Sequence, residues 1–329
     1  MKICVFGAGA TGGHFAVRLA EAGHEVSVVA RGAHLEAIRA NGLTLKQAGK
    51  STNVRVRATE RAGELGAQDA VIMGVKATGL KAAAPDLTAL LGPETVVVFP
   101  QNGMPWWYPV GLDDAAPTPP DLPVFGLAAE FRPHLGDERI AGGVIYSANV
   151  IEAPGVILNN TPRRNALVIS AVGPSAAPGI AALRAALVAS GIESDAPEDI
   201  RRIVWRKLLL NMSASTLALA TGTRSSIPRD DERLAETFRR ILAEGLAIAA
   251  AHGHDLTAET DAGRLLAGMP DHKPSILQDY EQGRPMEIGE IVLAPAAFAR
   301  AAGVATPTLD AVAAIVTRLA LDRGLYPAE

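Results

Sequence analysis

The sequence predicts an α/β domain with a parallel sheet, followed by an all-helical domain. Three observations predict this fold class. The N-terminal stretch up to Val29 follows the order strand, glycine turn, helix, strand. Short apolar runs then alternate with helical patterns as far as residue 197, and from residue 198 onward the pattern is almost wholly helical. We therefore expect two domains, residues 1–197 and residues 198–329, with a ligand cleft between them.

The first predicted strand ends in three glycines with the spacing G-x-G-x-x-G, at Gly7, Gly9 and Gly12. Glycine clusters also mark ordinary turns, but this one lies between an apolar run and a helical pattern that leads to a second strand. In that context the spacing is typical of a Rossmann-type dinucleotide site, because the glycines allow a tight turn and a close approach of the backbone to a pyrophosphate. The amides at the helix start would face the phosphates. The expected cofactor-binding loop comprises Gly7, Ala8, Gly9, Ala10, Thr11 and Gly12.

The end of the second predicted strand indicates which dinucleotide is bound. Many NAD sites carry an acidic residue there for the ribose 2′-hydroxyl, whereas this chain has Ala30 followed by Arg31. A guanidinium can hold a 2′-phosphate through two charge-assisted hydrogen bonds. We therefore expect NADP rather than NAD, with a solvent-exposed surface arginine as the alternative interpretation of Arg31.

Two further strands are predicted at residues 71–75 and 95–99, because both runs are continuously apolar, like strands buried on both faces. Polar residues follow them, Lys76 after the first and Asn102 after the second. Since open α/β sheets bind ligands at the carboxyl ends of their strands, both residues are candidates for the cofactor site, and Asn102 also for the substrate site. The alternatives are that Lys76 only ends a strand and that Asn102 belongs to an ordinary Asn-Gly turn.

The remaining elements of the first half follow from apolar spacing and from Gly and Pro punctuation. They are a helix at residues 33–41, short strands near 43–47 and 53–58, a helix at 80–91, a loop at 112–123, strands at 144–151, 156–158 and 166–169 as an antiparallel extension of the sheet, a helix at 175–189 and a short strand at 191–194. Between them, Trp106 and Trp107 belong to an aromatic cluster, for which three interpretations are open: it walls a pocket, fills a domain interface or packs locally.

In the helical half, Lys207, Asn211 and Ser215 are spaced four residues apart and share one face of a predicted helix. The rest of that helix is apolar on nearly every side, which favours a central position. Burying an ammonium and an amide costs several kcal/mol unless they are paired, so this polar stripe predicts a ligand site. An exposed polar stripe on an amphipathic helix is the alternative.

Further helices are expected at residues 198–220, 230–252, 258–268, 274–282, 287–302 and 307–323. Ser275, with Gln278 three residues later, fits a helix N-cap with a capping box, although amides at the same helix start could also hold a carboxylate. Glu287 lies at the start of another helix, where a carboxylate is favourable in any case. Each of these two signals is weak when taken alone.

Composition narrows the classes of partner and compartment. The net charge of −4 gives no general reason to expect nucleic acid or an anionic membrane as a partner. No apolar run approaches the ~18 residues of a membrane helix, no signal peptide precedes the first strand, and no dense His/Cys/Asp cluster indicates a metal site. The single cysteine, Cys4, lies in the first strand and is expected to be buried. We expect a cytoplasmic protein without a bound metal.

Taken together, these residues resemble the 2-dehydropantoate 2-reductase (ketopantoate reductase) family along nearly the whole chain. The residues that carry the resemblance are Gly7, Gly9, Gly12, Arg31, Val75-Lys76, Gln101-Asn102-Gly103, Lys207, Asn211, Ser275 and Glu287. The resemblance implies NADPH-dependent reduction of 2-dehydropantoate to pantoate in pantothenate and coenzyme A biosynthesis. It implies Lys207 as the general acid and Glu287 as a second catalytic residue, which together with Asn211 binds or orients the substrate. The implied substrate-binding residues are Asn102, Asn211, Ser215 and Ser275, with Ser275 at the carboxylate and Asn102 near the nicotinamide.

Two positions depart from the family pattern, because Ser215 and His272 stand where asparagines are common. Since these positions bear on recognition of the substrate hydroxyl, a reductase of a different branched 2-oxo acid is the main alternative. An opine-dehydrogenase-like enzyme and an NADP-sensing binding protein without activity also remain open. The expected partner is a small 2-oxo acid, and a homodimer is left open.

Overall fold

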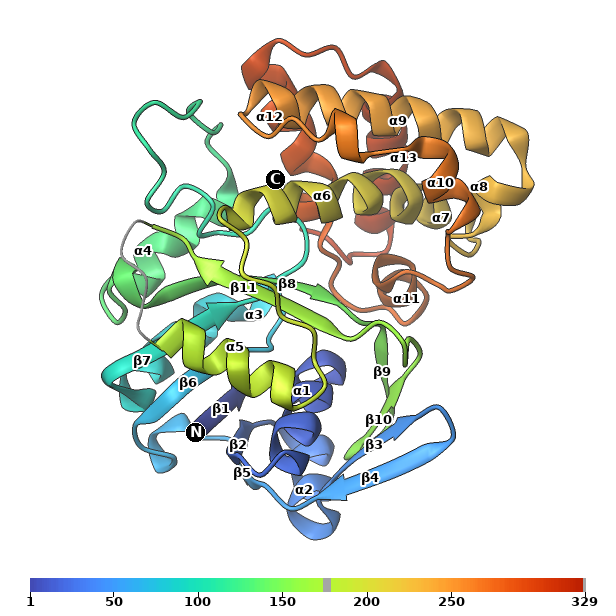
Figure 1. Cartoon of the computed structure of the whole chain (residues 1–329). Coiled ribbons are helices and arrows are strands. Elements are labelled where there is room, and N and C mark those ends of the chain that lie inside the picture. Colours follow the sequence, from blue (N-terminus) through green and yellow to red (C-terminus); the bar gives the residue numbers. More distant parts are fainter. Residues whose placement is uncertain (174–178, 328–329) are drawn as a thin grey trace. The chain divides into compact units, whose positions relative to one another are not determined.

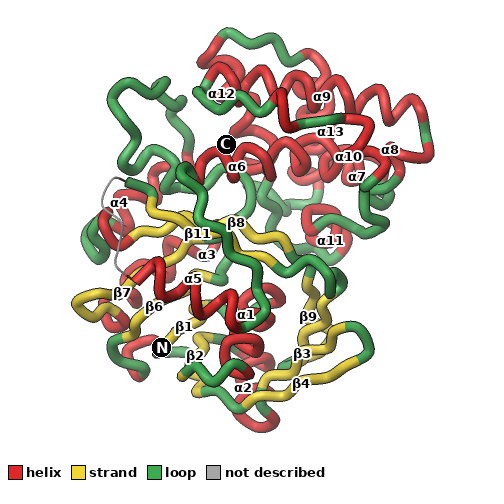
Figure 2. Tube along the Cα trace, in the orientation of Figure 1, coloured by secondary structure: helices red, strands yellow, loops and turns green. Residues whose placement is uncertain are grey.

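The computed structural model describes residues 1–173 and 179–327. The chain forms two compact units. The first contains Met1–Gln101, Trp106–Leu112 and Gly126–Ile200, and the second contains Asn102–Pro105, Asp113–Phe125 and Arg201–Glu329. Figure 1 shows the elements coloured along the sequence, and Figure 2 shows strands in the first unit and helices with loops in the described residues of the second. The predicted fold class, an α/β part followed by a helical part, is confirmed.

The first unit is built on a seven-stranded sheet with the order β11-β8-β7-β6-β1-β2-β5. Its strands are β1 (Lys2–Phe6), β2 (Glu25–Val29), β5 (Arg57–Thr59), β6 (Gln68–Met73), β7 (Leu91–Phe99), β8 (Ile140–Tyr146) and β11 (Ala166–Ala171). All neighbouring pairs are parallel except β8 and β11. The strand order reverses beside β1, since β2 lies on one side of it and β6 on the other. This is a Rossmann-type topology, and such sheets bind ligands at the reversal point.

The helices of the first unit are α1 (Ala10–Glu21), α2 (Gly32–Asn41), α3 (Ala77–Ala83), α4 (Leu127–Phe131) and α5 (Gly179–Ala189), with 3-10 turns at Ala62–Glu64, Ala84–Leu90 and Asp137–Arg139. A further 3-10 turn, Pro123–Gly126, lies where the chain passes from the second unit back to the first. The helix predicted at residues 33–41 is confirmed, and so is the one at 175–189 from Gly179 onward; residues 174–178 lie outside the described part of the chain. The helix predicted at 80–91 is wrong in extent and type. It begins earlier and changes to a 3-10 turn around Pro85, which has no N–H with which to continue an α-helix.

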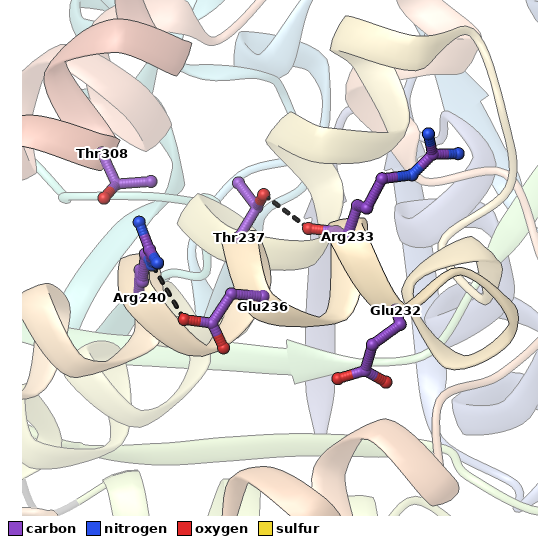
Figure 3. Close-up of a pocket in the computed structure, with 6 residues that line it drawn as sticks. All are labelled: Glu232, Arg233, Glu236, Thr237, Arg240 and Thr308. Carbon is purple, nitrogen blue, oxygen red and sulfur yellow. Dashed lines mark hydrogen bonds and ion pairs between the residues drawn. The ribbon is translucent and has the colours of Figure 1, made fainter.

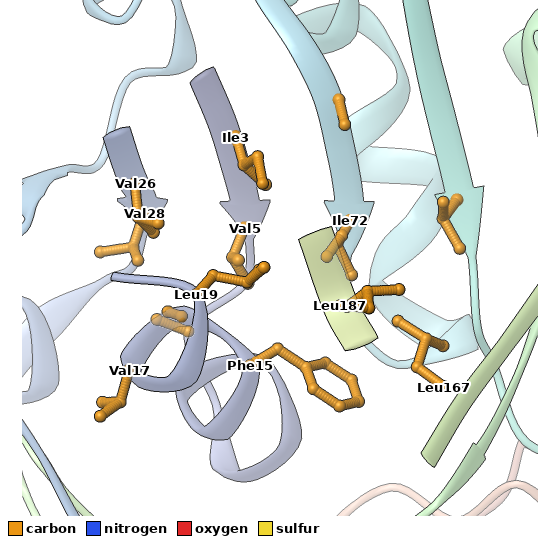
Figure 4. Packing of buried hydrophobic residues seen from close by; sticks show 14 of the residues in the cluster. Ile3, Val5, Phe15, Val17, Leu19, Val26, Val28, Ile72, Leu167 and Leu187 are labelled. Carbon is orange, nitrogen blue, oxygen red and sulfur yellow. The ribbon is translucent and has the colours of Figure 1, made fainter. Parts of the chain in front are cut away.

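Alternate side chains of the parallel strands build a hydrophobic core on one face of the sheet. Ile3 and Val5 of β1 face the same side as Ile72 of β6, because side chains alternate along a strand. Phe15 of α1 and Leu187 of α5 pack onto this face (Figure 4). All five side chains are buried. Burying each one stabilises the fold by roughly 1.5–3 kcal/mol, so the helix that follows the glycine loop is firmly held on the sheet.

A second, four-stranded sheet has the order β4-β3-β10-β9. Its strands are β3 (Leu43–Gln47), β4 (Lys50–Val54), β9 (Asn149–Ala153) and β10 (Val156–Asn159). Ile157 of β10 meets α1 so closely that a Cβ on Gly13 would lie 2.9 Å from its Cγ1. Because α1 also packs on β1 and β2, it lies between the two sheets.

This second sheet corrects the predicted antiparallel extension of the main sheet. Only β8 and β11 pair in that way. The strand expected at residues 144–151 is divided between β8 and β9, and the one near 53–58 is divided between β4 and β5. β10 pairs in parallel with β3, placing Val156 opposite Thr44, a pairing that no local pattern reveals. The strand expected at 191–194 is reduced to one bridge between Glu193 and Ala166.

The aromatic cluster after β7 packs inside the first unit. Trp106 stacks on Phe131 with ring centroids 4.8 Å apart and meets the edge of Phe99 at 5.0 Å. Trp107 donates its indole N–H to the Phe99 carbonyl at 3.1 Å, and both tryptophans are buried. These contacts favour local packing over a pocket wall.

The segment expected as a loop at residues 112–123 contains no helix or strand before Pro123, as predicted.

The second unit is helical in its described residues. Its elements are α6 (Ile200–Leu210), η5 (Asn211–Ser215), α7 (Thr216–Thr221), α8 (Ile227–Asp230), α9 (Glu232–Ala251), α10 (Ala262–Ala267), α11 (Ser275–Glu281), η7 (Gly289–Leu293), α12 (Ala294–Ala302) and α13 (Pro307–Asp322), with a 3-10 turn at Thr257–Glu259. The predicted helices are confirmed, although the one at residues 258–268 is shorter than expected. The two π-helical turns, η5 and η7, were not predicted. Among the described helices, none is both long and apolar enough to cross a membrane.

Candidate active site

The glycine loop joins β1 to α1 as the sequence predicts. Gly7 has a φ of 102°, and a Cβ there would lie 2.7 Å from the side chain of Val75, so only glycine fits this turn. A Cβ on Gly12 would lie 2.0 Å from the Gly7 carbonyl oxygen, so this glycine lets the helix approach the loop. At Gly9 no described atom lies within 4 Å of such a Cβ. The space beside Gly9 therefore fits a ligand that approaches the backbone closely.

The amides of the loop fall into two groups. Those of Gly7 and Ala8 both donate to the Val29 carbonyl, at 3.0 and 3.1 Å, and fix the loop against the end of β2. The amides of Ala10 and Thr11 lie in the first turn of α1, where no carbonyl inside the helix can accept them. The positive end of the helix dipole adds to these free donors. The residues present therefore fit a dinucleotide pyrophosphate.

Arg31 lies at the N-cap of α2, immediately after the buried Ala30, and is exposed. The Ala30 amide donates to the Thr59 carbonyl at 3.0 Å, which holds the end of β2 against β5. This position is two residues beyond Val29, which anchors the glycine loop. An exposed guanidinium next to that loop fits a 2′-phosphate.

His34, in the first turn of α2, was missed by sequence reasoning. Its Nε2 bonds the Ala8 carbonyl at 2.8 Å, and its Nδ1 bonds the Gly155 amide at 3.0 Å. Because a carbonyl only accepts and an amide N–H only donates, the ring must be neutral, with its proton on Nε2. His34 thus links the glycine loop to the hairpin of the second sheet. A histidine on an ordinary helical pattern carries no signal of this role, since Gly155 is distant in sequence.

At the end of β6, Lys76 is exposed and occupies the N-cap of α3. The strand itself ends at Met73, two residues earlier than predicted. Gln101 donates its side-chain amide to the carbonyls of Met73 and Val75, at 2.9 and 3.1 Å. Val75 in turn packs on Gly7, so Gln101 supports the turn that backs the glycine loop.

In the second unit, the structure brings Lys207 and Asn102 together. Lys207 lies in the last turn of α6 and donates from Nζ to Oδ1 of Asn102 at 2.5 Å. Both side chains are half-buried. A charge-assisted hydrogen bond is short and stronger than a neutral one, so Asn102 fixes the direction of the ammonium. These two predicted site residues are separated by more than a hundred positions in the sequence.

Asn211 and Ser215 do not continue the regular α-helix that the sequence predicts. They open and close the π-helical turn η5, in which the Thr216 amide donates to the Asn211 carbonyl, five residues back. Both side chains are half-buried, whereas Leu208 and Leu209 before them are buried. π-helical turns inside α-helices occur frequently at functional sites, and this one begins four residues after Lys207.

Glu287 and Ser275 occupy very different environments. Glu287 is 6 % exposed, and its carbonyl accepts the Ile291 amide at 3.1 Å just before the second π-helical turn. Ser275 is exposed and is the first residue of α11, which starts after Pro274. The predicted capping box is wrong, since Ser275 makes no capping bond and Gln278 donates to the Lys273 carbonyl at 2.8 Å.

His272, at a position that departs from the family pattern, is half-buried, and burial lowers its pKa. Its Nδ1 lies 3.0 Å from the hydroxyl of Ser225, and the Ser225 amide donates to the His272 carbonyl at 2.9 Å. Next to this pair, Ser226 donates to Asp271 at 2.8 Å. These bonds join the loop after α7 to the loop before α11. Ser225 carried no signal in the sequence.

A surface hollow in the second unit is a poorer candidate. It is lined by the charged start of α9 and by Thr308 (Figure 3). Glu236 and Arg240, four residues apart on α9, form an ion pair at 2.9 Å, and the Thr237 hydroxyl donates to the Arg233 carbonyl at 2.8 Å. None of the predicted site residues lines this hollow, so its charges serve the solvent-facing side of α9.

Comparison with known proteins addresses the family of the chain. Residues 3–113 match the family model of ketopantoate reductase PanE/ApbA, and residues 199–320 match the model of its C-terminal part. A 2-dehydropantoate 2-reductase of Mesorhizobium japonicum is 39% identical over 328 residues, 99% of this chain and 100% of that protein. A 2-dehydropantoate 2-reductase of Mycobacterium tuberculosis is 31% identical over 74% of each chain.

A solved structure gives the same result. The PanE/ApbA family ketopantoate reductase of Ralstonia eutropha JMP134 superposes with a TM-score of 0.79 at 27% identity, over 98% of this chain and all of that one. The agreement extends over both units. With two family models matched in order and a relative aligned along its full length, the chain belongs to the ketopantoate reductase PanE/ApbA family.

Proposed function

We propose that this protein reduces 2-dehydropantoate to pantoate with NADPH, and that Lys207 is the general acid. The observation that carries the proposal is the 2.5 Å hydrogen bond from Lys207 to Asn102, in a chain aligned over its full length with a protein named 2-dehydropantoate 2-reductase. The product would feed pantothenate and coenzyme A synthesis. A cytoplasmic location and a homodimer stay predictions.

The chemistry divides between the cofactor and the chain. NADPH, when bound, supplies the hydride that reduces the keto carbon. As negative charge grows on the keto oxygen, the Lys207 ammonium stabilises it and donates a proton. Asn102 orients that ammonium, and the buried Glu287 with Asn211 would bind or orient the substrate. Ser275, exposed at the start of α11, would reach the substrate carboxylate.

For the cofactor, the proposal assigns the glycine loop to the pyrophosphate. The free amides at Ala10 and Thr11, with the open space beside Gly9, support this assignment. Arg31 would hold the 2′-phosphate, and Lys76 would lie at the edge of the cofactor. We accordingly assign residues 1–197 to cofactor binding and residues 198–329 to substrate binding and catalysis.

The direct test is NADPH oxidation by the purified full-length chain against a panel of 2-oxo acids that includes 2-dehydropantoate. We expect 2-dehydropantoate to give the highest kcat/KM, and NADPH to be preferred over NADH. Turnover that requires an added amino acid would instead indicate an opine-dehydrogenase-like enzyme. NADPH binding without turnover of any 2-oxo acid would indicate a sensor and would contradict the proposal.

A reductase for a different branched 2-oxo acid is the second candidate, and Ser215 is the observation that favours it. A serine in place of an asparagine removes one amide that could bond the substrate hydroxyl. The matched comparison is kcat/KM for 2-dehydropantoate and for its analogue without that hydroxyl, in the wild type and in Ser215→Asn. A site built to bond a hydroxyl can reject the analogue by ~10⁴-fold. Rejection of that size in the wild type would exclude the second candidate.

A further inference from the structure

The segment Asn102–Pro105 belongs to the helical unit, and one main-chain hydrogen bond holds it there. The amide of Met104 donates to the carbonyl of Glu290 at 2.8 Å. Gly103 has a φ of 73°, and a Cβ on it would lie 2.6 Å from that same carbonyl oxygen. The segment therefore lies directly against the backbone of Glu290, which only glycine at position 103 permits.

A carbonyl inside a helix normally accepts a hydrogen bond from an amide of the same helix. The structure must therefore explain why the Glu290 carbonyl can accept the Met104 amide instead. In an α-helix the carbonyl of Glu290 would accept from the residue four positions on, Ala294, and in a π-helix from the residue five positions on. The Ala294 amide donates instead to the Gly289 carbonyl. Position 295 is a proline, which has no N–H. Both helical donors are therefore unavailable to Glu290, and its carbonyl accepts the Met104 amide.

The surroundings make this bond matter for the proposed chemistry. Met104 is buried, and burial raises the pKa of the Glu290 carboxyl, so water competes little for the bond. Hydrogen bonds in such surroundings are electrostatically stronger than in water. The turn η7 also packs against η5, the turn that carries Asn211 and follows Lys207. Glu287 lies three residues before Glu290, immediately before the first helical residue, Ile288.

We propose that Pro295 is a positioning residue, which keeps the π-helical turn η7 open so that the Glu290 carbonyl holds the Met104 amide and thereby fixes Asn102 against Lys207. The role in catalysis rests on the proposed reductase function. Pro295 touches no reacting atom in this scheme. Because Pro295 has no N–H, it cannot donate to the Glu290 carbonyl, and this carbonyl stays available to the Met104 amide.

The test is the variant Pro295→Ala. The new N–H allows η7 to convert into a regular α-helix, in which the Ala294 amide donates to the Glu290 carbonyl and the amide of residue 295 donates to the Ile291 carbonyl. We expect the Met104 amide to exchange with solvent at least ~10-fold faster than in the wild type, because a helical amide then competes with it for the Glu290 carbonyl. Residue-resolved hydrogen exchange measures this rate. Misplacing Asn102 and Lys207 by about 1 Å should lower kcat/KM for the 2-oxo acid by ~10–100-fold. The dissociation constant of NADPH should change by less than about twofold, because the glycine loop and Arg31, to which we assign the phosphates of the cofactor, belong to the other unit.

Pro307→Ala is the matched control. Pro307 is the first residue of α13. An N–H at this position has no acceptor inside the helix, so adding one leaves the helical hydrogen bonds unchanged. This variant should keep wild-type kinetics and wild-type exchange at Met104. A double-mutant cycle with Asn102→Ala separates positioning from general loosening. If Pro295 acts through Asn102, Pro295→Ala should cost little further activity in the Asn102→Ala background.

The outcomes are distinguishable from failure of the reductase function. A wild type that is inactive with every 2-oxo acid contradicts that function, and the Met104 exchange then decides the structural device by itself. Unchanged exchange and activity in Pro295→Ala, or equal losses in both backgrounds, would overturn the proposal. If Pro295→Ala does not fold, the exchange rate of the Met104 amide in the wild type tests the hydrogen bond to Glu290. Exchange of its Met104 amide as fast as that of exposed loop amides would overturn the anchor, and strong protection would support it.

Discussion

Lys207 is the residue on which the proposed chemistry depends most directly, because in that proposal its ammonium both stabilises charge and donates a proton. Replacing it with alanine should reduce turnover by ~10²–10⁴-fold, the usual contribution of a general acid. The affinity for NADPH should stay near the wild-type value, since the glycine loop belongs to the other unit. Steady-state kinetics with a fluorescence titration of NADPH measures both quantities.

Arg206 offers a matched control for this substitution. It precedes Lys207 on α6, carries the same charge and is exposed. Arg206→Ala should leave turnover within about threefold of the wild type, as is usual for surface substitutions. Full turnover in Lys207→Ala would mean that the proton comes from another group.

Arg31 should decide the choice of cofactor. A charge-assisted hydrogen bond is worth ~1.5–3 kcal/mol, so Arg31→Ala should weaken NADPH binding by roughly 10–100-fold and barely affect NADH. Dissociation constants for both cofactors give the answer. Arg39→Ala is the control, because Arg39 lies on the same helix but bonds the Ala58 carbonyl. Equal losses for NADPH and NADH in Arg31→Ala would refute the 2′-phosphate assignment.

At the scale of elements, His34 connects the second sheet to the glycine loop through the Ala8 carbonyl and the Gly155 amide. His34→Ala removes the donor to the Ala8 carbonyl and the acceptor of the Gly155 amide. Losing a neutral hydrogen bond costs ~0.5–1.5 kcal/mol, so the dissociation constant of NADPH should rise roughly three- to tenfold. Turnover at saturating NADPH should change little, because the proposal assigns the glycine loop to cofactor binding and proton transfer to Lys207.

Two further variants test whether His34 acts through both of its bonds. Glutamine has a donor and an acceptor on one side chain, so His34→Gln should recover part of the NADPH affinity that alanine loses. Glu36 lies on the same helix and pairs only with Arg39 among the described ion pairs. Glu36→Ala should bind NADPH like the wild type, and equal effects at residues 34 and 36 would argue for general loosening of α2.

The elements that sequence reasoning identified correctly are those with a local cause. β1, α1 and β2 follow from apolar periodicity and from glycines whose spacing has one structural use, as the Gly12 contact with Gly7 illustrates. The long helices α9 and α13 follow from apolar faces and from prolines and glycines at their ends. In these elements the residues that decide the structure are close neighbours in the chain.

The elements that sequence reasoning missed depend on partners that are distant in the chain. β9 and β10 are short strands, and only the pairing of β10 with β3 assigns them to a second sheet. We attribute the π-helical turn η7 to a single residue, Pro295, which helix periodicity does not register. In the candidate site, Lys207 and Asn102 were each predicted alone. Their hydrogen bond needs the folded unit.

At the scale of the whole molecule, one buried histidine should shape the pH dependence of stability. His14 of α1 is fully buried, and neither ring nitrogen has a hydrogen-bond partner among the described residues. Burial, helped by the positive charge of Arg18, lowers its pKa to about 4. An unpartnered imidazole of this kind is tolerated in the core only in its neutral form.

The sign of the effect follows from proton binding. Between the ordinary histidine pKa of 6.5 and the folded value of about 4, the unfolded chain binds a proton that the folded chain does not. The free energy of unfolding should therefore be unaffected by His14 above that window and fall as the pH drops through it. The loss amounts to about 3 kcal/mol at its lower end. His14→Leu, similar in volume and unable to ionise, should remove this part of the pH dependence.

The measurement must report on the unit that contains His14, because a chain of two compact units need not unfold in one step. The chain has three tryptophans, of which Trp106 and Trp107 lie in the first unit and Trp205 in the second. In a Trp205→Phe background, fluorescence during urea unfolding therefore follows the first unit. The difference in unfolding free energy between the chain with His14 and the His14→Leu variant should change by about 3 kcal/mol between pH 7 and pH 4. A difference that stays constant across this range would show that the imidazole finds a partner or water in the folded protein.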